Sequence, residues 1–436
     1  MRRLTALTVP SSLLAAGALL CAGAGVLAPS ASATGPGDRP AHGKHGHGHG
    51  HGHGKGHGHG QPGVRFATYN ASLNRATAGQ LIADLATGTN AQARAVAEVV
   101  QRTRPDVLLV NEFDHDDQGR AARLFRDLYL GVGQGGARGI EYPYWYAAPS
   151  NTGVPSGLDL DNDGTVGGGN DAFGFGEFPG QYGMVVYSRH PIQERQVRTF
   201  QRFRWADMPG ARLPDDPATP EPADWYSPAE LAQVRLSSKS HWDVPIRVGK
   251  RTVHLLASHP TPPTFDGPED RNGTRNADEI RFWADYVTGG RTARYVYDDR
   301  GRRGGLPPRS AFVVAGDLNS DPYDGDSVPG AVQQILEHPG VDATPVPTSA
   351  GAVEASRLQG GANATHRGPA SSDTADFADG APGNLRADYV LPGGGAQGER
   401  SGVFWPTLAD PLSRLTGVFP FPTSDHRLVW VDVRLR

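Results

Sequence analysis

The residues with the clearest chemical potential lie in the stretch Gly316-Asp317-Leu318-Asn319. This stretch follows the apolar run 311–315, which predicts a buried strand, and it precedes a run of turn residues. Asp317 and Asn319 are therefore expected at the carboxyl end of a strand, the edge where open α/β sheets bind ligands. A carboxylate and a carboxamide there suit a hard cation such as Mg²⁺ and the water that it activates. An Asx-rich turn explains this stretch alone equally well.

Three other predicted strands also end in a group that binds metals or phosphate. The strands span 64–70, 107–110 and 252–258, and the groups are Asn70, Glu112 and His259. A helix predicted over 80–104 stops before Pro105 and joins the first two strands, and this β-α-β order indicates a layered α/β domain. Considered alone, Glu112 is explained as a solvated carboxylate without a metal, and His259 is explained as a histidine with a structural role.

Asp388 and His426 form a predicted pair. Asp388 lies within the apolar strand predicted over 385–391, where a buried carboxylate needs a partner. His426 opens the last predicted strand, 426–435, directly after Asp425. A carboxylate bonded to a histidine fixes the tautomer of the ring and raises its basicity, as catalytic dyads require.

A possible cation site of a different kind lies in the loop-rich region 131–181. Carboxylates occupy alternate positions there and a glycine follows, and these carboxylates are Asp159, Asp161 and Asp163. The pattern matches the first half of a calcium-binding loop. The twelfth position is an asparagine rather than the glutamate of an EF-hand, and Asp171 is a candidate replacement ligand. We expect a structural Ca²⁺ site in this loop, with a solvated acidic turn as the alternative.

The first 33 residues have the features of an export signal. Arginines at positions 2 and 3 precede the apolar run 13–20, and Ala31-Ser32-Ala33 has the form of a cleavage signal. We therefore expect a signal peptide over 1–33 and a secreted protein. The only cysteine lies inside this segment, so the mature chain has no disulfide. No other apolar stretch is long enough to span a bilayer, and no transmembrane anchor is expected.

Residues 34–63 are rich in histidine and glycine and hold eight of the 16 histidines. Glycine at this density cannot build a packed core, so we expect a disordered segment. Its imidazoles would bind Zn²⁺, Ni²⁺ or Cu²⁺ loosely. The alternative is a solvated linker without a role in metal binding.

The ordered set of motifs resembles the endonuclease/exonuclease/phosphatase superfamily, which includes pancreatic-type deoxyribonuclease, repair nucleases of the exonuclease III type, bacterial sphingomyelinases and inositol polyphosphate 5-phosphatases. The motifs contain, in order, Asn70, Glu112, His259, Asp317, Asn319, Asp388, Asp425 and His426. The resemblance runs over residues 64–436 and implies one catalytic domain. It also implies a four-layer α/β sandwich, with two mixed β-sheets packed face to face and helices outside.

On the metal side, the resemblance implies that Glu112 holds a catalytic Mg²⁺ or Mn²⁺, assisted by Asn70 and Asp425. Asp317 and Asn319 are then expected to orient and deprotonate the attacking water. A cation in such a site activates the water and stabilises the charge that develops on the phosphoryl group.

On the phosphate side, the resemblance implies that His426, backed by Asp388, contacts the phosphate and stabilises charge at phosphorus. His259 is expected to be a second phosphate-side histidine or the general acid. The expected reaction is in-line hydrolysis of a phosphodiester or phosphomonoester without a covalent enzyme intermediate.

Composition leaves several substrate classes open. The net charge of −4 and the pI near 6.5 give no overall basic field that attracts nucleic acid. No exposed aromatic segment typical of a membrane-acting sphingomyelinase is evident. A scavenging phosphoesterase, a deoxyribonuclease-like nuclease and a sphingomyelinase-like phosphodiesterase all remain candidates, each expected to act as a monomer without a stable protein partner. The alternative from another class is a non-catalytic metal-binding protein.

Overall fold

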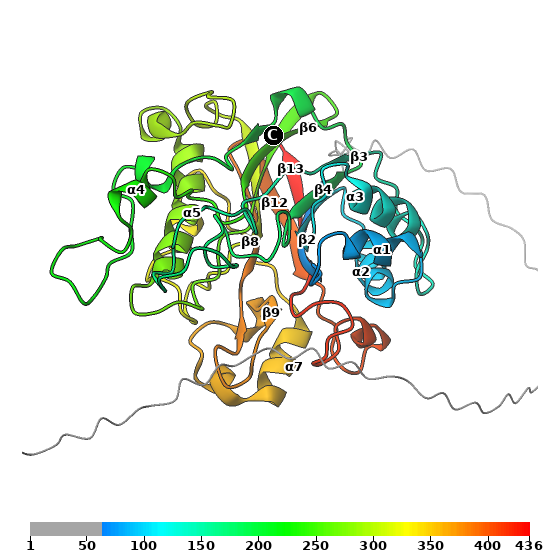
Figure 1. Ribbon diagram of the computed structural model, residues 1–436. Helices are drawn as coiled ribbons and strands as arrows, with labels where there is room; N and C mark the ends of the chain where they lie inside the picture. The colour runs from blue at the N-terminus through cyan, green and yellow to red at the C-terminus, as the bar shows by residue number, and fades with distance from the viewer. Residues whose placement is uncertain (1–62) are drawn as a thin grey trace, which may run out of the picture. The chain divides into compact units, whose positions relative to one another are not determined.

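Two β-sheets pack face to face at the centre of the computed structural model, which describes residues 63–436 (Figure 1). The first sheet has six strands in the spatial order β12-β13-β1-β2-β4-β3, and β1 and β2 are parallel. In chain order its strands are β1 (Val64–Leu73), β2 (Val107–Phe113), β3 (Tyr144–Tyr146), β4 (Met184–Ser188), β12 (Ala396–Val403) and β13 (Val429–Leu435).

The second sheet has five strands in the order β11-β8-β7-β6-β5, and β7 and β8 are parallel. In chain order its strands are β5 (Arg198–Thr199), β6 (His241–Val248), β7 (Arg251–Ser258), β8 (Ala311–Asp317) and β11 (Asp388–Gly393). A separate two-stranded sheet is formed by β9 (Ala375–Asp376) and β10 (Asn384–Leu385). Each large sheet therefore contains one parallel pair, and each such pair sends two carboxyl ends to the same edge.

Helices cover the outer faces of both sheets, with α1 to α3 on one side and α5 on the other (Figure 1). The α-helices are α1 (Gln80–Ala86), α2 (Ala91–Thr103), α3 (Arg120–Phe125), α4 (Pro228–Leu231), α5 (Arg271–Thr288), α6 (Gln333–Leu336) and α7 (Ala350–Gln359). The short 3₁₀ and π segments are η1 (Arg126–Leu130), η2 (Glu194–Gln196), η3 (Trp205–Asp207), η4 (Thr292–Tyr295), η5 (Gly361–Thr365), η6 (Ala370–Ser372) and η7 (Pro411–Leu415).

Both faces of each sheet are apolar, because successive apolar residues of a strand point to opposite faces. In β2, Val107 and Leu109 face the core between the sheets, whereas Leu108 and Val110 face the helices. Successive strand residues point to opposite faces, so a strand that is covered on both sides needs a continuous apolar run. The result is four layers, α/β/β/α, and the predicted sandwich fold is confirmed.

Some predicted element boundaries differ in the structure. The helix predicted over 80–104 is two helices, because Gly88 has a positive φ of 66° and the Asn90 side chain caps α2 by accepting a bond from Ala93 N at 3.0 Å. The strand predicted over 385–391 is divided between β10 and β11, and Asp388 is the first residue of β11. The last strand begins at Val429 instead of residue 426.

The described residues belong to one compact unit. No helix among them combines the length and the apolar character needed to cross a membrane. The predicted signal peptide, 1–33, and residues 34–62 of the His/Gly-rich segment lie outside the described residues.

Candidate active site

Strand ends from both sheets meet at one edge of the sandwich. Asn70 lies near the end of β1 and Glu112 near the end of β2, while His259 follows β7 and Asp317 ends β8. Asn70 Nδ2 donates a hydrogen bond to Asp317 Oδ2 at 3.0 Å, which links the two sheets at this edge. The convergence predicted from the sequence is therefore present.

Asp317 is the centre of the site. Its side chain is 1% exposed, and its Oδ2 lies 3.3 Å from His259 Nε2 and 3.7 Å from His426 Nε2. Its Oδ1 accepts a bond from Asn319 N at 2.9 Å. Burial alone would raise the pKa of this carboxyl, but the charge of His426 and the hydrogen bonds from His259 and Asn70 outweigh it and hold the pKa well below its usual range. Asp317 is consequently an ionised acceptor in a water-poor site.

His426 and Asp388 form the predicted pair. His426 Nδ1 lies 2.9 Å from Asp388 Oδ2, and both side chains are buried. Burial would lower the pKa of His426, but the charges of Asp388 and Asp317 outweigh it and raise this pKa well above its ordinary value. His426 is therefore protonated at neutral pH and presents its Nε2–H beside Asp317.

His259 has the opposite protonation preference. Burial, reinforced by the charge of Lys239, lowers the pKa of His259 to about 4. Its Nδ1 has no hydrogen-bond partner among the described residues, while its Nε2 faces Asp317. A neutral ring with the proton on Nε2 fits this environment. The two histidines therefore both lie near the Asp317 carboxylate, but they differ in charge.

Glu112 and Asp425 form the part of the site that fits a divalent cation. Burial raises the pKa of Glu112 and the charge of Asp425 raises it further, which shows that the two carboxylates repel each other. Neither forms an ion pair with an arginine or lysine of the described chain. Glu112 also has a φ of 55°, a left-handed conformation that is costly for a residue with a side chain. The donor set suits Mg²⁺ or Mn²⁺.

The side-chain amide of Asn70 acts chiefly as a hydrogen-bond donor to a carboxylate. Its Nδ2 bonds Asp317, and its Oδ1 accepts from Ser72 N at 3.2 Å. The remaining lone pair of Oδ1 is compatible with a cation, and the predicted role of Asn70 as a metal ligand stays a prediction. Oxygen and nitrogen atoms of Asp317, Asp388 and His426 also lie within 4.8 Å of one another, and there His426 forms an ion pair with Asp388.

The helix α5 holds the loops that carry the candidate site residues His259 and Asn319. Asn276 Nδ2 donates to Thr261 O at 2.8 Å and to Leu318 O at 2.9 Å, and so ties the loop after β7 to the loop after β8. Glu279 accepts bonds from Thr261 N and from Ser238 N, each at 2.7 Å. The sequence analysis gave these two polar residues no role.

Three further residues at the site were missed by the sequence analysis. Thr374 Oγ1 donates to Asp388 Oδ2 at 2.8 Å, and the Phe377 ring packs edge-on against His426 with 5.3 Å between centroids. Both come from the region 340–384, which the sequence indicates only as loop. Lys239 is buried in the segment before β6. The one feature of the sequence that draws attention to it is that lysine is rare, because the chain has only four lysines.

The acidic loop brings together a different set of carboxylates from the predicted one. Oxygens of Asp159, Asp161 and Asp171 lie within 4.8 Å of one another, and Asp163 is not in this group. Asp159 Oδ2 accepts from Gly164 N at 2.9 Å, and Asp171 Oδ2 accepts from Gly167 N at 2.7 Å. The loop is thus held by its own backbone amides, and the Ca²⁺ site stays a prediction.

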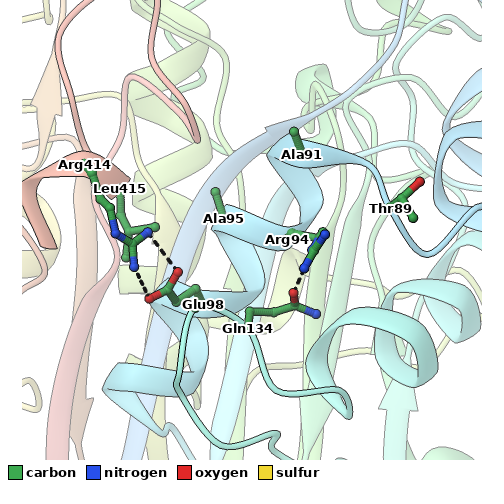
Figure 2. Close-up of a pocket in the computed structure, with 9 residues that line it drawn as sticks. Thr89, Ala91, Arg94, Ala95, Glu98, Gln134, Arg414 and Leu415 are labelled. Atoms are coloured by element: carbon green, nitrogen blue, oxygen red, sulfur yellow. Dashed lines mark hydrogen bonds and ion pairs between the residues drawn. The ribbon is translucent and has the colours of Figure 1, made fainter. Parts of the chain in front are cut away.

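A surface hollow of about 290 Å³ lies between α2 and η7 (Figure 2). Arg414 Nη1 donates to Glu98 Oε2 at 3.0 Å, and Arg94 Nε donates to Gln134 Oε1 at 2.9 Å (Figure 2). None of the predicted site residues lines this hollow. The charge of Glu98 is already neutralised by arginines of the fold.

An exposed apolar loop leads into the site, contrary to the expectation that no such segment exists. Val418 is 66% exposed and Phe419 is 83% exposed. The chain continues from this loop to Asp425 and His426. The signal was present in the sequence as Val-Phe-Pro-Phe-Pro, but its exposure depends on the fold.

Residues 67–426 match the family model described as Endonuclease/Exonuclease/phosphatase family. The chain belongs to this family, whose members are hydrolases that act on phosphoester bonds. The match spans the residues that build the site from β1 to His426. No curated protein sequence matches the chain.

Solved structures similar to this chain have low sequence identity. An endonuclease/exonuclease/phosphatase from Beutenbergia cavernae is 18% identical, covering 86% of this chain and 72% of that one, with a TM-score of 0.46. Sphingomyelinase C from Streptomyces griseocarneus is 16% identical over 85% and 99%, with a TM-score of 0.41. A Staphylococcus aureus beta toxin variant with bound magnesium ions is 12% identical over 85% and 99%, with a TM-score of 0.40.

Proposed function

We propose that this protein is a secreted phosphoesterase that depends on a divalent metal and hydrolyses a phosphodiester or phosphomonoester by in-line attack of water. The observation that carries the proposal is the buried Asp317 carboxylate, bracketed by His259 and His426 beside the Glu112–Asp425 pair. An ionised acceptor next to a cation site and a protonated histidine is an arrangement that supports attack of water on phosphorus.

Glu112 and Asp425 would hold the Mg²⁺ or Mn²⁺, with Asn70 as a candidate third ligand. When bound, such a cation polarises a phosphoryl oxygen and lowers the pKa of water. The chain's own groups supply the rest. Asp317 accepts a hydrogen bond from the attacking water and aims it, and Asn319 N fixes the carboxylate that does so.

The two histidines supply electrostatic stabilisation on the phosphate side. His426 is protonated and donates from Nε2 to a phosphate oxygen, where negative charge develops during the reaction. Asp388 and Thr374 hold its ring in place. His259 is neutral and donates a hydrogen bond from Nε2. Because it prefers the neutral state, we assign it a role in hydrogen bonding and not in proton transfer.

The test is hydrolysis by the purified protein and by Glu112→Gln. Plasmid DNA, RNA, sphingomyelin vesicles, bis-p-nitrophenyl phosphate and p-nitrophenyl phosphate are each offered with Mg²⁺, Mn²⁺ or Ca²⁺, and with EDTA. We expect hydrolysis that EDTA abolishes, and a loss of about 10³-fold in the variant, equivalent to about 4 kcal/mol. Absence of hydrolysis with every metal would contradict the proposal. Sequencing the amino terminus of protein from the medium tests secretion, and residue 34 is the expected start.

Within this class, exposure of Val418 and Phe419 favours a substrate at a lipid surface as the second candidate function. Large apolar side chains that remain exposed commonly mark a surface for association, and this loop precedes Asp425 and His426 in the chain. Phe419→Ser should then slow hydrolysis of sphingomyelin in vesicles at least fivefold and leave hydrolysis of soluble bis-p-nitrophenyl phosphate unchanged. Equal rates of the variant and the wild type on vesicles would exclude a role of this loop at lipid surfaces.

A further inference from the structure

Lys239 lies at a fixed position beside the catalytic loop of His259. It stands two residues before β6, whose first residue, His241, pairs with Ser258 at the end of β7. The neighbouring Ser238 Oγ donates to His259 O at 3.4 Å, and Ser238 N is held by Glu279. The backbone that carries Lys239 is therefore anchored to the same buried glutamate as the loop after His259.

The Lys239 side chain is buried and has no protein partner. The residue is only 7% exposed, yet its ammonium makes no hydrogen bond and no ion pair within the part of the chain that the structure describes. Its charge nevertheless acts on Glu112, Asp317 and His259. Its nitrogen is not among the fully buried polar atoms that lack a partner, so it remains open to a small ligand from the site. Such a group is explained when a ligand supplies the acceptor.

The nearby acids do not fill this role. Glu279 accepts hydrogen bonds from Thr261 N and Ser238 N, and Asp317 accepts from Asn70 and faces both histidines. The charge of Asp425 adds to the rise in the pKa of Glu112, and the proposed cation would take up the charge of both carboxylates. With these acids occupied, the positive charge of Lys239 lacks a bonded anionic partner among residues 63–436.

We propose that the Lys239 ammonium binds a non-bridging oxygen of the substrate phosphate, on the side of His259. This inference rests on the proposed phosphoesterase function and adds a cation that belongs to the protein itself. A phosphate group has several anionic oxygens, so it can bind a metal and a lysine at the same time. Lys239 would then contact the substrate directly and stabilise the charge that develops at phosphorus.

The first experiment measures phosphate affinity by isothermal titration with inorganic phosphate, in the presence of Mg²⁺. Lys239→Gln is compared with Lys250→Gln, which removes the same charge from the exposed turn between β6 and β7. We expect at least a tenfold loss of phosphate affinity for Lys239→Gln and less than twofold for Lys250→Gln. The KM for bis-p-nitrophenyl phosphate should rise with the same pattern. Lys239→Met, which keeps the apolar stem, replaces the glutamine variant if the latter does not fold.

The second experiment uses the unmodified protein. Lysines are acetylated in the presence and absence of inorganic phosphate, and the rate at each lysine is read by mass spectrometry. Phosphate should slow the modification of Lys239 at least threefold and leave that of Lys250 unchanged. Equal phosphate binding by both glutamine variants, or no protection of Lys239, would overturn the inference. Phosphate binding that depends on Lys239 without hydrolysis of any ester would support the inference and contradict the proposed function.

Discussion

Two regions of the molecule concentrate carboxylates, and they hold them in different ways. Around Asp317, the acids are buried and their partners come from several strands distant in the sequence, such as Asn70 and His426. In the loop from Asp159 to Asp171, the acids bond mainly backbone amides within a dozen residues of themselves. The first region places charge in a dry environment, and the second shapes a loop at the surface.

The difference concerns what each carboxylate is free to do. A buried acid with charged neighbours has a perturbed pKa and strong interactions, because water does not screen them. An acid that is bonded mainly to nearby backbone amides fixes a turn. Similar runs of Asp and Asn in the sequence therefore form a cluster with partners from distant strands in one region and a locally bonded loop in the other.

The largest expected effect comes from exchanging a carboxylate for an amide in each region. Asp317→Asn should lower the kcat for bis-p-nitrophenyl phosphate by about 10³-fold or more, about 4 kcal/mol, because it removes the ionised acceptor between the histidines. Asp161→Asn should retain at least half of the activity. Steady-state kinetics with Mg²⁺ measure both. Similar losses in the two variants would remove the functional contrast between the regions.

A second expected effect is a pH dependence of stability that comes from the buried residue His241. Burial lowers the pKa of His241 to about 4, so below pH 6.5 the unfolded chain binds a proton at this residue that the folded chain does not. Stability should therefore fall as the pH drops from 6.5 toward 4, and His241 should account for about 3 kcal/mol of the fall. Urea unfolding at pH 7 and pH 4 should show a correspondingly smaller loss for His241→Gln. An unchanged loss would place the pH dependence in other groups.

The smallest expected effect is a difference in unfolding free energy between substitutions of two asparagines. Asn276→Ala leaves the buried carbonyls of Thr261 and Leu318 without their bonds and should cost about 2 kcal/mol of unfolding free energy. Asn170→Ala removes an exposed bond to Asp161 and should change stability by less than about 0.5 kcal/mol. Urea unfolding of both variants measures the difference. Equal costs would mean that the acidic loop is as strongly coupled to the fold as the site.

Sequence reasoning was most successful where the pattern was local. The apolar runs before Glu112 and Asp317 indicated buried strands, alternation before Asn70 indicated another strand, and the order of elements indicated the layered sheets. Boundaries were less accurate where a single backbone conformation decides them, as at Gly88 within the predicted helix. The role of Asn276 could not be predicted, because its two partners lie in loops far apart in the sequence.

The sequence by itself determined the strands, the residues at their ends, and the pairing of Asp388 with His426, because alternation and turn chemistry act over a few positions. Only the tertiary structure decided that the pKa of His426 is raised and that of His259 lowered, that Asp171 joins Asp159 and Asp161 in place of Asp163, and that Lys239 has no bonded partner among the described residues. These properties depend on which charges and how little water surround a group after folding. Such surroundings are set by contacts between distant segments, and no local pattern records them.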